Sequence, residues 1–146
     1  MIHDVVITEL KQIHDTRGKV MRMIDLESPT FAGFGSMYFS CVYPKKIKAW
    51  HLHKVMTLNY AVPVGRIRLV LYDSRINSPT YGELQEIIMG TENYCLVTVP
   101  PYIWNGFKGE GDKMSVVANC ASIVHSDDEI VRIKLNDPSI PFEWLY

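Results

Sequence analysis

The stretch Lys48-Ala49-Trp50-His51-Leu52-His53-Lys54 places two histidines one residue apart within an extended, mostly apolar run. A β-strand turns alternate side chains to the same face, so a strand here would direct both imidazoles to one side of a sheet. Histidine is the side chain best suited to transfer a proton near neutral pH, and it is also the commonest metal ligand. We therefore expect the chemistry of this protein to begin at His51 and His53.

The sequence on both sides of this stretch has the pattern of short β-strands. Segments rich in β-branched and aromatic residues are separated by glycine, proline and asparagine. We expect strands over residues 5–10, 19–25, 36–43, 48–54, 56–62, 66–73, 84–89, 94–99, 114–124 and 130–135. Residues 100–111, with their prolines and glycines, are predicted to form a turn, and residues 126–129 one short helical turn. This pattern predicts an all-β sandwich or barrel, which protects the edges of its sheets from aggregation.

Length and composition restrict the class of protein. With 146 residues, 47% of them hydrophobic, the chain has the size of one domain. The formal net charge is -1 without a long block of either sign, which argues against nucleic acid and membrane surfaces as partners. Polar residues interrupt every apolar run before it could span a bilayer, and the first residues lack the profile of a signal peptide, so we expect a cytoplasmic protein. Cys41, Cys95 and Cys120 are expected to be buried, reduced thiols.

His51, His53 and Gly65 stand at the spacing H-x-H, eleven residues, Gly. This spacing resembles the first motif of the cupin superfamily, in which a glutamate lies between the histidines and the glycine; Leu58 stands at its position here. The second cupin motif, P-x-G-x-x-H, is represented by its proline, with Asn105 in place of the histidine. The resemblance implies a double-stranded β-helix, or cupin jelly roll, as a single domain over residues 1–146. Because two of the four metal ligands of the superfamily are replaced, we expect no metal.

Further motifs stand in order along the chain: D-x-R-G at 15–18, K-A-W-H at 48–51, D-x-R-x-x-S-P-T-Y-G at 73–82, N-G-F at 105–107, and N-D-P up to E-W at 136–144. In order and spacing they resemble the motifs of the dTDP-4-dehydrorhamnose 3,5-epimerases and their relatives. The S-P-T-Y-G stretch is the most specific piece. The resemblance implies an isomerase of nucleotide-linked 4-keto-6-deoxy sugars that works without a cofactor.

The same resemblance assigns roles to individual residues. In that family a histidine, oriented by an aspartate, removes the proton next to the keto group, and His51 and Asp137 match these two positions. The place of the family's proton-returning tyrosine falls near Ala118, and that of its lysine at Leu58. Counting by twos across the following hairpin turns Tyr60 to the face of the histidines, which makes it a candidate catalytic phenol. The candidate substrate-binding residues are Arg17, Lys48, His53, Arg75, Tyr102 and Asn105.

Several of these residues also have a structural interpretation. His53 could form a hydrogen bond in the core, and the two tyrosines could simply pack. Lys48 could be a solvated surface side chain, and Arg17 and Arg75 could each fasten the turn that follows an aspartate.

Three hypotheses follow for the function. The leading one is a nucleotide-sugar epimerase that inverts one carbon rather than two, because only one good proton donor is expected. The alternative is a degenerate cupin that binds a sugar nucleotide without turnover, as the replacements at Leu58, Ala118 and Asn105 suggest. The third is a metal cupin that uses the two histidines and a distant ligand such as His125. The resemblance also implies a homodimer with exchanged strands, and an exposed edge strand over residues 5–10 would give that pairing a physical reason.

Overall fold

The computed structural model describes residues 1–145, which form twelve β-strands and no helix. The strands are β1 (Val6–Glu9), β2 (Gln12–Asp15), β3 (Gly18–Met21), β4 (Ser36–Val42), β5 (Ile47–His53), β6 (Leu58–Val64), β7 (Arg66–Asp73), β8 (Leu84–Gly90), β9 (Cys95–Val99), β10 (Ile103–Glu110), β11 (Ser115–Ala121) and β12 (Ile130–Arg132). The all-β prediction is confirmed. Residues 126–129 form a hydrogen-bonded turn, in which the Glu129 amide donates to the Ser126 carbonyl.

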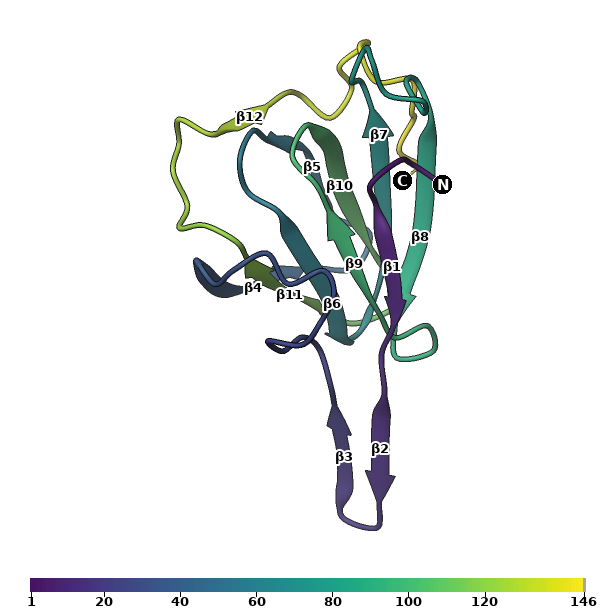
Figure 1. Ribbon diagram of the computed structural model, residues 1–146. Coiled ribbons are helices and arrows are strands. Elements are labelled where there is room, and N and C mark those ends of the chain that lie inside the picture. The colour runs from purple at the N-terminus through teal and green to yellow at the C-terminus, as the bar shows by residue number, and fades with distance from the viewer. Residues whose placement is uncertain (146) are drawn as a thin grey trace.

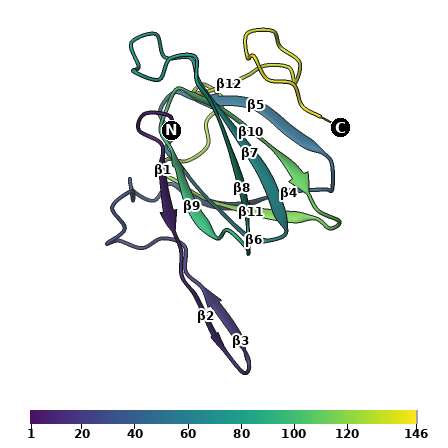
Figure 2. The same cartoon turned by 90° about the vertical axis from the view of Figure 1, so that its right-hand side faces the viewer.

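Two five-stranded antiparallel sheets pack face to face (Figures 1 and 2). One sheet has the order β1-β9-β6-β11-β4, and the other has the order β12-β5-β10-β7-β8. Their inner faces meet in a core of buried side chains, such as Val62 and Val97 from the first sheet and Leu69 and Met89 from the second. Burying each of these side chains contributes about 1.5–3 kcal/mol relative to leaving it exposed. The expected cupin jelly roll is therefore present.

Strand β10 corrects the prediction that residues 100–111 form a turn. It lies between β5 and β7 in the second sheet, and two of its glycines allow neighbouring backbone to come close. A Cβ at Gly106 would overlap the Ala49 side chain and lie 3.0 Å from the Ala49 Cα, and one at Gly109 would overlap the carbonyl of Tyr43. These glycines therefore mark close approach within the sheet.

The C-terminal segment covers the outer face of the second sheet and fixes how β5 is turned. Trp50 points outward from β5 and packs against Phe142 and Trp144, with ring centroids 6.0 Å and 5.2 Å away. The Trp50 indole N–H donates to the carbonyl of Leu135 at 3.2 Å. Because side chains alternate along a strand, this anchor turns His51 toward the space between the sheets.

Strands β2 and β3 form a hairpin that stands clear of the two sheets (Figure 1). The sequence pattern predicted no strand where β2 lies, and it predicted a longer strand, over 19–25, where β3 lies. Arg17 lies in the hairpin turn and is bound to Asp15 at 2.8 Å. No helix in the described part of the chain has the length and apolar character needed to cross a membrane.

Candidate active site

A cavity of about 540 Å³ opens between the two sheets beside β5. His51, His53 and Lys48 reach it from β5, and Tyr38 and Tyr60 reach it from β4 and β6 of the other sheet. The sequence predicted the alternation that brings His51, His53 and Tyr60 to one space, and the structure places all three there. A larger hollow of about 680 Å³ lies beside Pro63–Arg66, but no histidine, tyrosine or cysteine among residues 1–145 lines it.

His53 is held by a buried carboxylate. Its Nδ1 is paired with Oε1 of Glu129, whose other oxygen accepts hydrogen bonds from the backbone amides of Val55 and Met56, both at 3.2 Å. Although burial acts to raise the pKa of the Glu129 carboxyl, the hydrogen bonds from His53 and from these amides lower it below its usual value. The carboxylate form is therefore favoured, and it fixes the orientation of the His53 ring.

His51 is held by neutral groups. Its Nε2 lies 3.3 Å from the Tyr60 hydroxyl, which donates in turn to Oδ1 of Asn105 at 3.2 Å. The Nδ2 of Asn105 donates to the carbonyls of His51 and Ile103, which fixes the direction of this amide. Because the single Tyr60 proton goes to Asn105, the phenol oxygen can only accept from His51. This assigns the proton of His51 to Nε2 and leaves the lone pair on Nδ1.

The His51 imidazole stays neutral over the physiological pH range. Burial, together with repulsion from His53 and Arg132, lowers the pKa of His51 to about 3. The rings of His51 and His53 lie edge to face with their centroids 5.6 Å apart. The pair can thus take up a proton at one ring while the other, with its carboxylate, offers a hydrogen bond to a nearby oxygen.

The buried amide of Asn119 supports the phenol of Tyr38 at the opposite wall. Its Nδ2 donates to the Tyr38 oxygen at 2.8 Å, and its Oδ1 accepts from the Asn59 amide at 2.9 Å. Sequence reasoning missed Tyr38, although Tyr38, Ser40 and Val42 alternate along one strand and would share a face. It also missed Glu129, because only the pairing of β12 with β5 brings that residue to His53.

The resemblance gives Asp137 the role of orienting His51, but Asp137 does not line the cavity. Its carboxylate accepts hydrogen bonds from the hydroxyl and the amide of Ser139, which lower its pKa, and no hydrogen bond among the described residues joins it to His51. The carboxylate that binds one of the two β5 histidines is Glu129. Tyr102 is half exposed, and its amide donates to the His53 carbonyl at 2.7 Å.

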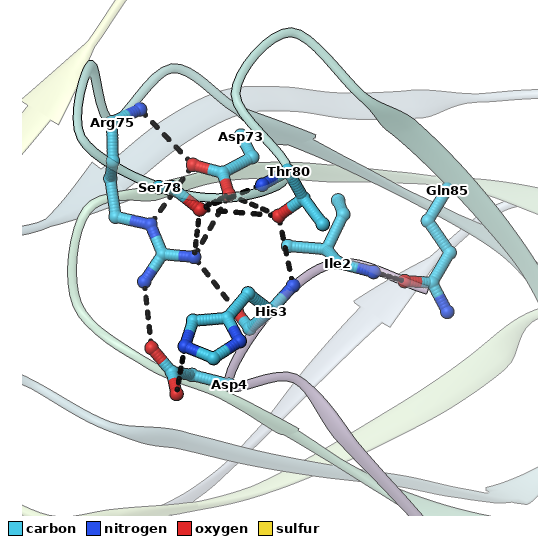
Figure 3. Close-up of polar contacts among 8 residues, drawn as sticks. All are labelled: Ile2, His3, Asp4, Asp73, Arg75, Ser78, Thr80 and Gln85. Atoms are coloured by element: carbon cyan, nitrogen blue, oxygen red, sulfur yellow. Dashed lines mark hydrogen bonds and ion pairs between the residues drawn. The ribbon is translucent and has the colours of Figure 1, made fainter.

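The two predicted arginines are both engaged by protein groups. The Arg75 guanidinium donates hydrogen bonds to the carboxylates of Asp73 and Asp4 and to the His3 carbonyl (Figure 3). The Asp73 carboxylate is fully buried and also accepts hydrogen bonds from the hydroxyls of Ser78 and Thr80. Burial acts to raise the pKa of Asp73, but these donors lower it well below its usual value. This cluster attaches the first residues of the chain to the loop after β7. Neither Arg75 nor Arg17 lines the cavity.

Lys48 and Arg132 supply positive charge at the cavity. The Lys48 ammonium donates to the Ser40 hydroxyl at 3.1 Å, and Arg132 lies on β12 opposite His51. Within residues 1–145, no three histidine, cysteine or acidic side chains gather closely enough to hold a metal ion. His125, the proposed third ligand, lines the cavity but pairs with Asp127 at 3.0 Å.

Comparison with known proteins identifies the family to which the chain is similar. A family model described as dTDP-4-dehydrorhamnose 3,5-epimerase matches residues 1–146. The probable low-salt glycan biosynthesis epimerase Agl13 of Haloferax volcanii is 33% identical over 98% of this chain and 94% of its own length.

Solved structures are similar as well. The crystal structure of a dTDP sugar isomerase from Desulfovibrio desulfuricans has a TM-score of 0.96 and 44% identity, covering 98% of this chain and 92% of its own. A second structure is that of ChmJ, a 3'-monoepimerase from Streptomyces bikiniensis solved with dTDP-quinovose. It has a TM-score of 0.87 and 18% identity, and the match covers 98% of this chain and 76% of the ChmJ chain. At this identity the similarity supports the fold alone.

Proposed function

Because this chain belongs to the dTDP-4-dehydrorhamnose 3,5-epimerase family, we propose that it epimerises a nucleotide-linked 4-keto-6-deoxy sugar at one carbon next to the keto group. The observation that supports this most directly is the pair of imidazoles at one wall of the cavity, one neutral and one bound to a buried carboxylate. A C–H bond beside a carbonyl is broken only when a base touches the proton and the developing oxyanion is stabilised.

We assign removal of the proton and stabilisation of the oxyanion to the two histidine rings of the cavity. His51 is the base, since it is neutral at physiological pH and its Nδ1 lone pair has no hydrogen-bond partner among residues 1–145. His53, when protonated, donates from its Nε2 edge to the keto oxygen, and Glu129 supports that charge. Asn105, one of the predicted substrate-binding residues, has its amide fully engaged by Tyr60 and two carbonyls.

The sugar enters the cavity and the diphosphate remains at its cationic side. Lys48 and Arg132 line the cavity and can neutralise phosphate oxygens there. Solved members of the fold were crystallised with dTDP or dTDP-sugars, and we propose the same class of carrier for this chain. We further propose a homodimer. Its support is the edge strand β1, with Val6 and Ile7 each 40% exposed, and the hairpin, with Ile13 50% and Val20 60% exposed.

Deuterium exchange tests the proposed reaction. A dTDP-linked 4-keto-6-deoxyhexose incubated with the protein in D2O should gain deuterium at one carbon next to the keto group, followed by NMR. We expect His51→Gln to slow this exchange by at least about 100-fold, the usual effect of a positioned acid or base. His14→Gln, an exposed histidine on β2, is the matched control and should exchange as the parent does.

The proposal fails if the parent protein exchanges no proton of any dTDP-, UDP- or GDP-linked 4-keto-6-deoxy sugar. Binding of such a sugar without exchange, measured by calorimetry, would instead identify a protein that holds the ligand without turnover.

A further inference from the structure

Inversion of a carbon needs a proton donor on the face opposite to the base. His51 and His53 stand on one sheet, and two phenols, Tyr38 and Tyr60, enter the same cavity from the other sheet. Tyrosine is a general acid that proteins use for proton return. The hydrogen bonds of the two phenols decide between them.

Tyr60 is already engaged. Its only proton is donated to Oδ1 of Asn105, and the direction of that amide is fixed by two backbone carbonyls. Burial raises the pKa of Tyr60 well above its usual value, so loss of its proton would leave a phenolate without water around it. Tyr60 therefore positions His51 and is unsuited to give up a proton.

Tyr38 has the opposite arrangement. Its oxygen accepts a hydrogen bond from Nδ2 of Asn119, and the Asn119 amide cannot be reversed because its Oδ1 accepts from the Asn59 backbone amide. The Tyr38 hydroxyl donates to no group among residues 1–145, so its proton is free to point into the cavity. Tyr38 is 37% exposed, so water can reach it and return a proton to the hydroxyl.

We propose that Tyr38 is the general acid that returns the proton to the sugar carbon on the face opposite to His51; this rests on the epimerase function proposed above. His51 takes the proton as the C–H bond breaks, and the electron pair moves into the enolate, whose oxygen bears the negative charge. The enolate carbon then takes the proton of the Tyr38 hydroxyl, which forms the new C–H bond, restores the carbonyl and leaves a phenolate. The Asn119 amide stabilises that phenolate. Exchange with water removes the proton from His51 and returns one to Tyr38.

Separate measurement of exchange and inversion tests this role. In D2O with a dTDP-linked 4-keto-6-deoxyhexose, NMR reports both deuterium entry and formation of the epimer. Tyr38→Phe should still admit deuterium, with the rate lowered by less than about 5-fold, while epimer formation falls at least about 100-fold.

Tyr43→Phe is the matched control, since Tyr43 follows the same strand, is 68% exposed and does not line the cavity. It should leave both rates as they are in the parent. Thermal unfolding of each variant confirms that it is folded. Tyr38→Phe with an unchanged ratio of inversion to exchange would overturn the role of Tyr38 and leave the epimerase function standing. A parent protein that exchanges nothing would overturn both.

Discussion

At the scale of the residue, His51 shows how neutral neighbours can set up a histidine. The Tyr60 hydroxyl and the Asn105 amide fix its tautomer, while burial keeps it uncharged. The result is an imidazole that is always available to accept a proton but holds it weakly. Such a base needs the enolate to be stabilised by other groups, which is the part assigned to His53 and Glu129.

The low pKa of His51 predicts a pH dependence of stability. An unfolded chain binds a proton at this histidine near pH 6.5, whereas the folded protein binds it only at about pH 3. Between these values the unfolded state holds more protons, so this contribution to the free energy of unfolding is complete above about pH 6.5 and is lost as the pH falls toward 3.

Urea unfolding at several pH values between neutral and acidic measures this effect. On acidification, His51→Gln should lose less stability than the parent, because the glutamine side chain binds no proton. The exposed His14→Gln should follow the parent. Equal pH slopes for the parent and His51→Gln would contradict the low pKa.

At the scale of the element, β10 is a strand on which the site depends and which the sequence pattern did not predict. Asn105 comes from β10, and a register shift between Asn105 and Phe107 sets how β10 pairs with β5. Gly106 lies in that shift, against Ala49.

Gly106→Ala should therefore destabilise the protein. The added methyl group overlaps the Ala49 side chain, and overpacking of this kind costs about 1–3 kcal/mol. The shift of β10 should also disturb Asn105 and lower the rate of deuterium exchange. Urea unfolding measures the first effect and NMR the second.

The double variant Gly106→Ala with Ala49→Gly provides the control, because removing the Ala49 methyl group relieves the overlap. The double variant should lose less free energy of unfolding than the sum of the losses measured for the two single variants. Strict additivity would show that close approach is not the reason for this glycine.

Sequence patterns predicted those elements whose signal is local. The alternation over 66–73 gave β7 with its observed bounds, and the same period placed Tyr60 with the histidines. The pattern failed at β10, because glycine signals a turn as readily as a close contact between strands. Glu129 and Tyr38 were missed for another reason: their roles depend on which strands are neighbours, and this is a property of the assembled sheets.

At the scale of the whole molecule, the cavity lies between the two sheets, while the hairpin and β1, which do not line it, present exposed apolar side chains. Exposure of apolar side chains such as Ile13 and Val20 to water is unfavourable, and a second copy of the chain would bury them. The proposed homodimer uses this surface.

Val20→Glu tests the dimer. Val20 is 60% exposed, so the charge should leave the fold of one chain intact but should be costly in a buried interface. Size-exclusion chromatography with light scattering should give twice the chain mass for the parent and a shift toward the single mass for the variant. Thr91→Glu, in a surface loop, is the control. A parent protein that elutes as a monomer at all concentrations contradicts the pairing.

The attachment of the first residues by Arg75 has a consequence for synthesis. Ile2, His3 and Asp4 bind partners that lie 71 to 83 positions later in the chain, and β1 pairs with β9. A growing polypeptide on the ribosome has none of these partners when residues 2–9 emerge. Residues 2–9 must therefore remain unpaired until residues 75–99, which contain their partners, have been translated.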